Sequence, residues 1–170
     1  MTGSRVTSAA DVLEVMAAFD DARIEAWIAG GWAVDSLIGE QTRPHRDLDL
    51  AVRADHMDRA VSTLRGLRYR RGLDLRPVRL VMEGRGGRMV DLHPVAFDAL
   101  GQGRQVGDRD RVFEYPPDGF GSGAIDGVVV PCLTAEQLVR FHLGYEPQDH
   151  DRHDMALLRD RLRIEVPPPY

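Results

Sequence analysis

Two glycines in the first part of the chain have the residue type and the setting of a phosphate-binding turn. Gly30 and Gly31 lie between a short apolar segment and a stretch with helical spacing. Glycine allows close approach of the backbone, and the start of a helix offers free N–H groups and the positive end of its dipole to a phosphate. Glycine is also common in plain strand-to-helix turns, so the pair alone leaves both interpretations open.

Asp47 and Asp49 form the second group of candidate residues. In a strand, residues two positions apart point to the same side, so both carboxylates face one way while Leu48 and Leu50 face the core. Neighbouring carboxylates repel each other unless a cation lies between them, and hard oxygen ligands favour Mg²⁺. The alternative is a solvated strand face that binds nothing.

Asp91 is the third candidate, because it lies in the centre of an apolar segment, residues 89–94. A carboxylate in such a place is costly if it is unpaired. A salt bridge to an arginine is one solution. A neighbouring strand that brings Asp91 beside Asp47 and Asp49 is the other, and it would complete a metal site with three carboxylates.

A short basic run, residues 42–46, directly precedes the acidic pair. Pro44 keeps the run extended, and Arg43, His45 and Arg46 supply two guanidiniums and an imidazole. Arginine binds phosphate through a bidentate fork. A phosphate turn, a basic run and an acidic cluster that binds metal, in this order, indicate a pocket for a nucleoside triphosphate.

The elements that position these residues follow from the spacing of apolar side chains. We predict helices over residues 9–22, 32–38, 55–64, 134–143 and 151–163. We predict strands over 24–29, 48–52, 76–82 and 88–93, and a hairpin with strands 124–125 and 128–132. Residues 98–123 are expected to form a long loop with one short strand near Phe113. The late hairpins predict an α+β fold with a mixed β-sheet flanked by helices.

Length and composition limit the class of protein. With 170 residues, 43% of them apolar, the chain has enough apolar side chains for one hydrophobic core. We divide the chain into a core unit, residues 1–133, and a small C-terminal helical segment packed on it, residues 134–170. The net charge of -5 argues against binding of duplex nucleic acid. The single cysteine, Cys132, excludes an intrachain disulfide. Neither a signal peptide nor an apolar run of membrane-spanning length is visible, so we expect a cytoplasmic protein that binds no membrane.

Several stretches of the chain resemble one enzyme superfamily. Residues 27–35, 42–52 and 90–94 are similar to the nucleotidyltransferase superfamily of polymerase-beta type. More narrowly, they resemble the lincosamide nucleotidyltransferases and the aminoglycoside 2''-nucleotidyltransferases. Residues 127–132 and 141–147 resemble the lincosamide branch in particular. The resemblance covers most of the chain, roughly residues 11–167, and implies the nucleotidyltransferase type of mixed-sheet core.

The resemblance also implies a reaction and its residues. A hydroxyl of a bound antibiotic attacks the α-phosphorus of a nucleoside triphosphate, with ATP expected, and pyrophosphate leaves. Asp47 and Asp49 match the metal ligands, with two Mg²⁺ ions expected, and Gly30 and Gly31 match the phosphate turn. Asp91 matches the third carboxylate, which ligates metal, acts as general base, or does both.

Other residues have open roles. His93 is a rival general base, because it lies two residues beyond Asp91 and faces the same way in a regular strand; packing against Pro94 is its alternative role. His142, Tyr145 and Glu146 are weak candidates for contact with the acceptor. The charged run 149–154 suits a helix start, where acidic side chains complement the dipole.

The acceptor is the least determined part of the hypothesis. A lincosamide is the first choice and an aminoglycoside the second. A nucleotidyltransferase that acts on RNA or protein would be favoured by a basic groove outside the site. A nucleotide-binding module without catalysis is the remaining alternative, and the intact carboxylates argue against it. Because the C-terminal part is small, we expect a homodimer in which the second subunit completes the acceptor pocket.

Overall fold

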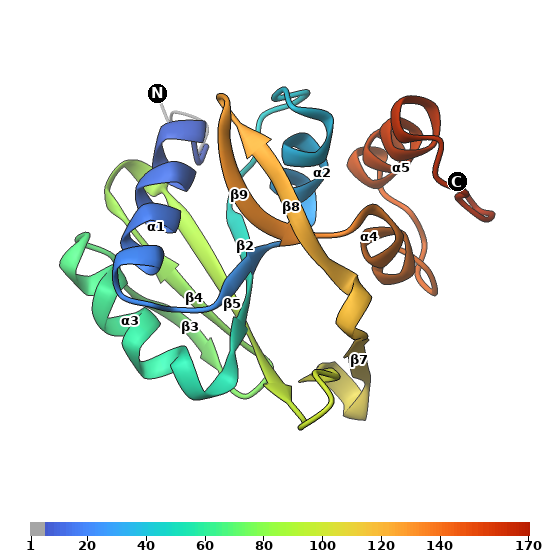
Figure 1. Ribbon diagram of the computed structural model, residues 1–170. Coiled ribbons are helices and arrows are strands. Elements are labelled where there is room, and N and C mark those ends of the chain that lie inside the picture. Colours follow the sequence, from blue (N-terminus) through green and yellow to red (C-terminus); the bar gives the residue numbers. More distant parts are fainter. Residues whose placement is uncertain (1–5) are drawn as a thin grey trace.

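Nine strands form one mixed sheet in the computed structural model, which describes residues 6–170 (Figure 1). The main path runs in the order β3-β4-β5-β2-β1-β9-β8, and β6 and β7 extend it from β5. The pairs β2/β5 and β1/β9 are parallel, and the other pairs are antiparallel. The strands are β1 (Ala26–Ile28), β2 (Leu48–Arg53), β3 (Arg70–Leu75), β4 (Arg79–Glu83), β5 (Met89–Phe97), β6 (Gly103–Val106), β7 (Val112–Tyr115), β8 (Phe120–Ile125) and β9 (Val128–Leu133).

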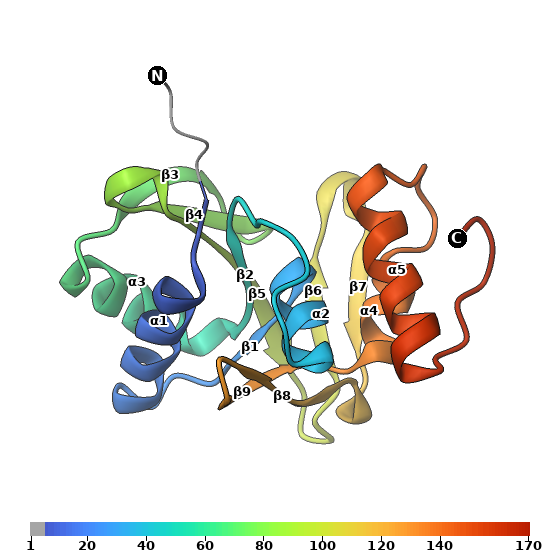
Figure 2. The same cartoon turned by 90° about the horizontal axis from the view of Figure 1, so that it is seen from above.

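The described part of the chain also forms five α-helices. They are α1 (Ala9–Asp21), α2 (Gly30–Ile38), α3 (Met57–Gly66), α4 (Ala135–Phe141) and α5 (Asp149–Leu162). Figures 1 and 2 show α1 and α3 together at one end of the molecule, α4 and α5 at the other end, and α2 between them. This mixed sheet with flanking helices confirms the predicted fold class.

Helix α1 begins where the sequence predicts it. The Ser8 side chain accepts a hydrogen bond from the Asp11 backbone N–H, and the Asp11 carboxylate accepts one from the Ser8 N–H. This capping box satisfies two donors at the helix start that have no partner within the helix. The N-terminal segment ahead of it, where no signal peptide is expected, lies partly outside the described residues.

The centre of the sheet is apolar on the side that faces away from the site. Leu48 and Leu50 of β2 pair with Val90 and Leu92 of the parallel strand β5, and all four side chains are fully buried. Because side chains alternate across a strand, this burial directs the residues between them to the opposite side of the sheet. The side chain of Asp49, which lies between Leu48 and Leu50, therefore points to the side of the sheet that carries the site.

Two predictions about secondary structure are wrong. Residues 98–123 are not a long loop, because they contain β6, β7 and the start of β8; of that prediction, only the short strand near Phe113 is confirmed, as β7. Strand β3 was missed, since all of its six residues are exposed and show no alternation of burial. The strand predicted over residues 76–82 begins later in the structure, as β4 (Arg79–Glu83). Strand β3 lies at the edge of the sheet, where burial imposes little pattern on the sequence.

The C-terminal helices follow directly on the sheet. Strand β9 ends at Leu133 and α4 begins at Ala135, and α5 packs on α2. The division of the chain at residue 133 remains a prediction. Among residues 6–170, the helices are all too short or too polar to cross a bilayer.

Candidate active site

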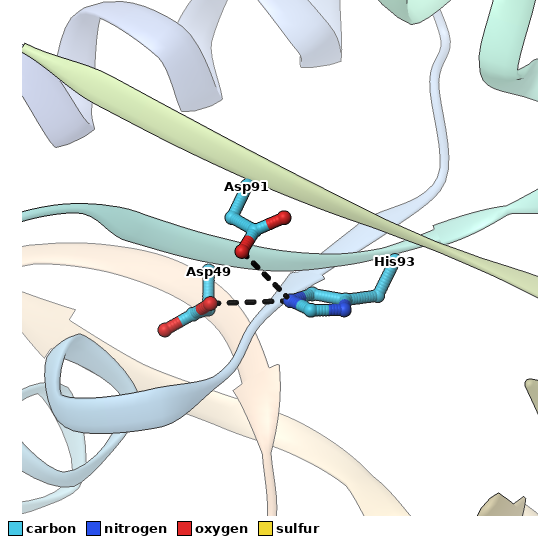
Figure 3. Close-up of side chains that lie close together, drawn as sticks. All are labelled: Asp49, Asp91 and His93. Atoms are coloured by element: carbon cyan, nitrogen blue, oxygen red, sulfur yellow. Dashed lines mark hydrogen bonds and ion pairs between the residues drawn. The ribbon is translucent and has the colours of Figure 1, made fainter. Parts of the chain in front are cut away.

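The pairing of β2 with β5 brings two of the predicted carboxylates together. Asp49 lies directly opposite Asp91 in the parallel register, and Figure 3 shows both side chains directed to the same side. Asp91 is 3% exposed, and Arg79 from β4 donates to its Oδ2 at 2.6 Å. The sequence therefore predicted the proximity of these carboxylates correctly, and the arginine that pairs with Asp91 comes from the strand on its other side.

The environment of Asp91 favours its protonated form. Burial raises the pKa of Asp91 to about 6, and the charges of Asp49 and Asp47 add to this effect. The nearby His93 imidazole and Arg79 guanidinium lower the pKa of Asp91 but do not cancel this effect. A carboxyl group with a pKa near neutrality is suited to accept a proton during a reaction.

Asp47 lies one residue before β2 and is half-buried. Burial raises its pKa, and the neighbouring negative charge of Asp49 raises it further. The closest possible metal-ligand atoms come instead from Asp49, Asp91 and His93, which all lie within 4.8 Å of one another. Asp47 is outside this tight group, although it is near enough to Asp49 for their charges to interact.

The acidic cluster has the properties of a cation site. Oδ1 of Asp91 is buried and has no hydrogen-bond partner among the described residues. Burial is the main cause of the raised pKa values of Asp47 and Asp91, and the negative charge of Asp49 adds to both; a bound cation would offset these effects. Carboxylate oxygens are the ligands that Mg²⁺ prefers. These residues therefore fit a divalent cation.

The two glycines lie against the acidic and basic groups of the site. Helix α2 starts at Gly30, whose φ is 58°, a backbone region that favours glycine. A Cβ at Gly30 would collide with the Asp49 carboxylate, and one at Gly31 would collide with the side chains of Arg43 and His45. Only glycine therefore lets these groups approach the N-terminus of α2 so closely.

The basic run is held by acidic partners from two helices. Arg43 donates from Nε and Nη2 to the two carboxylate oxygens of Asp154 in α5, at 2.9 and 2.6 Å. His45 is buried, and its Nε2 lies 2.5 Å from Oδ2 of Asp35 in α2. Burial alone would raise the pKa of Asp35, but hydrogen bonds to His45 and Thr42 hold it below its usual range.

A pocket of about 400 Å³ opens beside these groups. Its lining combines the glycine turn, the basic run and the acidic pair with side chains of the C-terminal helices: Gly30, Gly31, Arg43, Pro44, His45, Arg46, Asp47, Asp49, His142, His150, Asp151 and Asp154. Of the three weak acceptor candidates, the structure brings only His142 to the pocket. Tyr145 is 41% exposed, and the Glu146 side chain is 92% exposed, near Arg152.

The charged run at the start of α5 is more than a solvated helix start. Asp151 accepts a hydrogen bond from the Gln148 N–H, as expected of an acidic residue in a first turn. Asp151 and Asp154 are nevertheless 4% and 2% exposed. Both carboxylates line the pocket, a placement that the charge pattern alone did not predict.

Three further residues contact the site but were not predicted. Arg79 pairs with Asp91, and Gln105 and Tyr115 form a hydrogen-bonded chain that ends at His93. Gln105 and Tyr115 lie on β6 and β7, in the segment that we expected to be a loop. Alternating burial along β6 is a weak signal that could have located Gln105.

Comparison with known proteins agrees with this geometry. A model of the aminoglycoside-2''-adenylyltransferase family matches residues 11–158. The chain belongs to this family. It is similar to a lincosamide resistance protein of Staphylococcus haemolyticus, with 26% identity over 149 residues, 88% of this chain and 92% of that protein. It is also 35% identical over 148 residues to a 2''-aminoglycoside nucleotidyltransferase of Escherichia coli, which covers 78% of this chain and 71% of that protein.

Solved structures share the fold of this family member. The lincosamide antibiotic adenylyltransferase LnuA, crystallised with lincomycin, has a TM-score of 0.82 at 24% identity and covers 91% of this chain and 98% of its own. ANT(2'')-Ia in complex with adenylyl-2''-tobramycin has a TM-score of 0.72 at 21% identity, with coverage of 91% and 88%. The protein is therefore an enzyme of the nucleotidyltransferase type.

Proposed function

We propose that this enzyme transfers a nucleoside monophosphate from ATP to a hydroxyl group of a lincosamide and releases pyrophosphate. The observation that carries the proposal is the placement of Asp49 and Asp91, opposite each other on parallel strands and beside the N-terminus of α2. That arrangement puts a cation site and a proton acceptor next to a turn that can hold phosphate. Membership of the family supports nucleotidyl transfer as the reaction.

Each part of the pocket has a distinct task in this proposal. Asp47, Asp49 and Asp91 would hold Mg²⁺, which neutralises charge on the phosphates and aligns the attacking and leaving groups. The backbone N–H groups at Gly30 and Gly31 bind phosphate oxygens, and exposed Arg46 adds a guanidinium. Arg43 and His45 line the same pocket, where Asp154 and Asp35 fix their directions.

Asp91 is the group that we assign to the acceptor hydroxyl. A hydroxyl group is too weak an acid to ionise near neutral pH, so attack on phosphorus benefits from a proton acceptor. Burial raises the pKa of Asp91 to about 6 and makes it a better acceptor than an ordinary carboxylate. His142, at the edge of the pocket, is in place to contact the acceptor.

A lincosamide is our first choice of acceptor because of the extent of the likeness. The lincosamide resistance protein is matched over 92% of its length, whereas the aminoglycoside enzyme is matched over 71%. The acidic lining of the pocket, with Asp151 and Asp154, keeps an aminoglycoside as the alternative, since that drug is polycationic. Pairing of Asp154 with Arg43 reduces the negative charge available to such a drug.

The proposal is tested by incubating the enzyme and Mg²⁺ with a panel of lincosamides and aminoglycosides and each nucleoside triphosphate in turn. Mass spectrometry should show an adenylylated lincosamide, and the Asp49→Asn variant should form none. If an adduct forms on aminoglycosides alone, the acceptor is an aminoglycoside and not a lincosamide. Absence of any adduct, with nucleotide bound, would favour a non-catalytic nucleotide-binding module.

A second candidate acceptor is RNA, and one surface feature favours it. A pocket of about 660 Å³ near the edge strand β3 is lined by five arginines and a single acid, Glu83. The arginines are Arg65, Arg68, Arg70, Arg71 and Arg85, and none of them forms an ion pair with another described residue. The same assay with RNA as acceptor decides between RNA and an antibiotic. If RNA is the acceptor, it should gain the nucleotide, and Arg68→Gln should reduce this transfer.

A further inference from the structure

His93 lies between the carboxylates of the site and a buried amide group. Its Nε2 lies 3.1 Å from Oδ1 of Asp49 and 3.8 Å from Oδ2 of Asp91. Dashed lines in Figure 3 mark these two contacts. Nδ1 of His93 lies 3.1 Å from Nε2 of Gln105. A neutral imidazole has one nitrogen that donates and one that accepts, so the position of its proton decides what His93 can do at the site.

The orientation of the Gln105 amide is determined by partners on its other side. The Tyr115 hydroxyl donates to Oε1 of Gln105 at 2.6 Å, and Nε2 of Gln105 donates to the Val78 carbonyl at 3.4 Å. A backbone carbonyl only accepts, so the amide nitrogen must face it. Burial raises the pKa of Tyr115, which keeps its hydroxyl protonated as a donor. Gln105 and Tyr115 are 7% and 3% exposed, which leaves water little access.

The amide nitrogen that faces His93 can only donate, so Nδ1 of His93 must carry the lone pair. The ring proton is then on Nε2 and points toward Asp49. Building on the function proposed above, we propose that Gln105 and Tyr115 hold His93 as the Nε2–H tautomer. In this neutral form Nε2, the nitrogen that faces the carboxylates, donates a hydrogen bond to Asp49 and has no lone pair for a proton or a metal ion, so His93 is a positioning residue.

This assignment changes the reading of the three-residue cluster. Of the three residues whose possible ligand atoms lie within 4.8 Å of one another, only Asp49 and Asp91 then have a lone pair directed at the cluster that a cation could use. The hydrogen bond from His93 holds Oδ1 of Asp49, while Oδ2 lies beside Gly30 and the phosphate turn. Asp91, and not His93, is then the residue of the cluster that accepts the proton of the acceptor hydroxyl.

The tautomer is measured directly by NMR on protein with ¹⁵N-labelled histidine, at alkaline pH, where the ring is neutral. The chain has six histidines, so the His93 signals are assigned by their loss in His93→Asn. We expect a protonated Nε2 and an unprotonated Nδ1 in the wild-type protein. The opposite pattern would overturn the proposal. The spectrum needs neither nucleotide nor acceptor, so it decides this inference even where the proposed transfer reaction fails.

Two variants test the chain of hydrogen bonds. Gln105→Leu and the milder Tyr115→Phe should give a mixture of tautomers. Loss of such an indirect partner is expected to lower kcat about 10- to 100-fold for Gln105→Leu, with little change in the KM for the triphosphate. An unchanged His93 spectrum in folded Gln105→Leu would contradict the proposal, as would a rise in KM without a fall in kcat.

Gln137→Leu is the matched control. Gln137 is another buried glutamine, 1% exposed, whose amide donates to the Glu114 carbonyl at 2.9 Å. Its replacement removes a buried amide of the same size without touching His93. We expect the control to keep the wild-type His93 spectrum and kcat, and a control that loses both would show that general loosening of the fold explains the effect of Gln105→Leu.

Discussion

Arg43 and Asp154, which are 111 residues apart in the sequence, form a two-pronged ion pair across the candidate site. Asp154 is 2% exposed and Arg43 is 22% exposed. The Asp154 carboxylate raises the pKa of the Arg43 guanidinium, which stays charged in any case. The pair joins α5 to the segment that precedes the acidic strand β2.

Removing one side of this pair should weaken the fold and the pocket together. Asp154→Asn leaves a partly buried guanidinium without its counter-charge, and we expect a loss of about 2 kcal/mol in the free energy of unfolding. Urea unfolding measures it. The matched control is Asp160→Asn, which breaks the exposed pair with Arg159 and should leave stability unchanged. An equal effect of both variants would contradict a special role for the Arg43–Asp154 pair.

Asp49→Asn should abolish turnover and leave the fold intact. The negative charge of Asp49 raises the pKa of both Asp47 and Asp91, so its removal relieves repulsion in the metal-free protein. The asparagine side-chain oxygen can still accept the hydrogen bond from His93. Circular dichroism checks the fold, and calorimetric titration with Mg²⁺ and a triphosphate checks metal binding. Turnover near the wild-type level at saturating Mg²⁺ would disprove the metal assignment.

The sequence identified the part of the site that local patterns can encode. The alternation of leucine with Asp49, the isolated Asp91 and the paired glycines each have a short-range cause, and the structure places them together. Their partners came from distant segments: Asp154 pairs with Arg43, and Gln105 reaches His93 from β6. Strand β3 is fully exposed, so no hydrophobic pattern marked it. A contact between distant elements produces no periodic pattern in a single sequence. A strand at a solvated edge produces none either, because neither of its faces is buried.

We predict that the enzyme is a homodimer in which the second subunit completes the acceptor pocket. The prediction arose from the small C-terminal part, yet His142, His150, Asp151 and Asp154 of the same chain already line the pocket. A second subunit would therefore complete the acceptor side of the pocket, not the nucleotide side. Light scattering at the assay concentration should give twice the mass of 19.0 kDa. A monomeric mass together with full activity would count against the dimer.

Asp91 is expected to affect stability in a pH-dependent way. Its pKa is about 6 in the folded protein, mainly because of burial, against an ordinary value of 3.8. Between these two values the folded protein holds a proton that the unfolded chain releases, so stability falls as the pH rises from about 4 to about 6. Above pH 6 the ionised carboxylate costs the metal-free protein about 2 to 3 kcal/mol. Asp91→Asn should therefore be more stable than wild type at pH 8, and the difference should shrink toward pH 4.

A second substitution of Asp91 distinguishes a role as general base from a role as metal ligand. Asp91→Ala should lose about 10² to 10⁴ in turnover if the residue takes the proton of the acceptor hydroxyl. If Asp91 acts only as a base, triphosphate affinity in the presence of Mg²⁺ stays near the wild-type value, and if it also binds metal, affinity falls with turnover. His93→Ala is the comparison, because His93 shares its side of β5 and hydrogen-bonds to Asp49. Its turnover should fall less than that of Asp91→Ala, since it removes a positioning group and leaves the proton acceptor. A variant at His93 that is inactive while Asp91→Ala remains active would show that the proton acceptor is the imidazole and not the carboxylate.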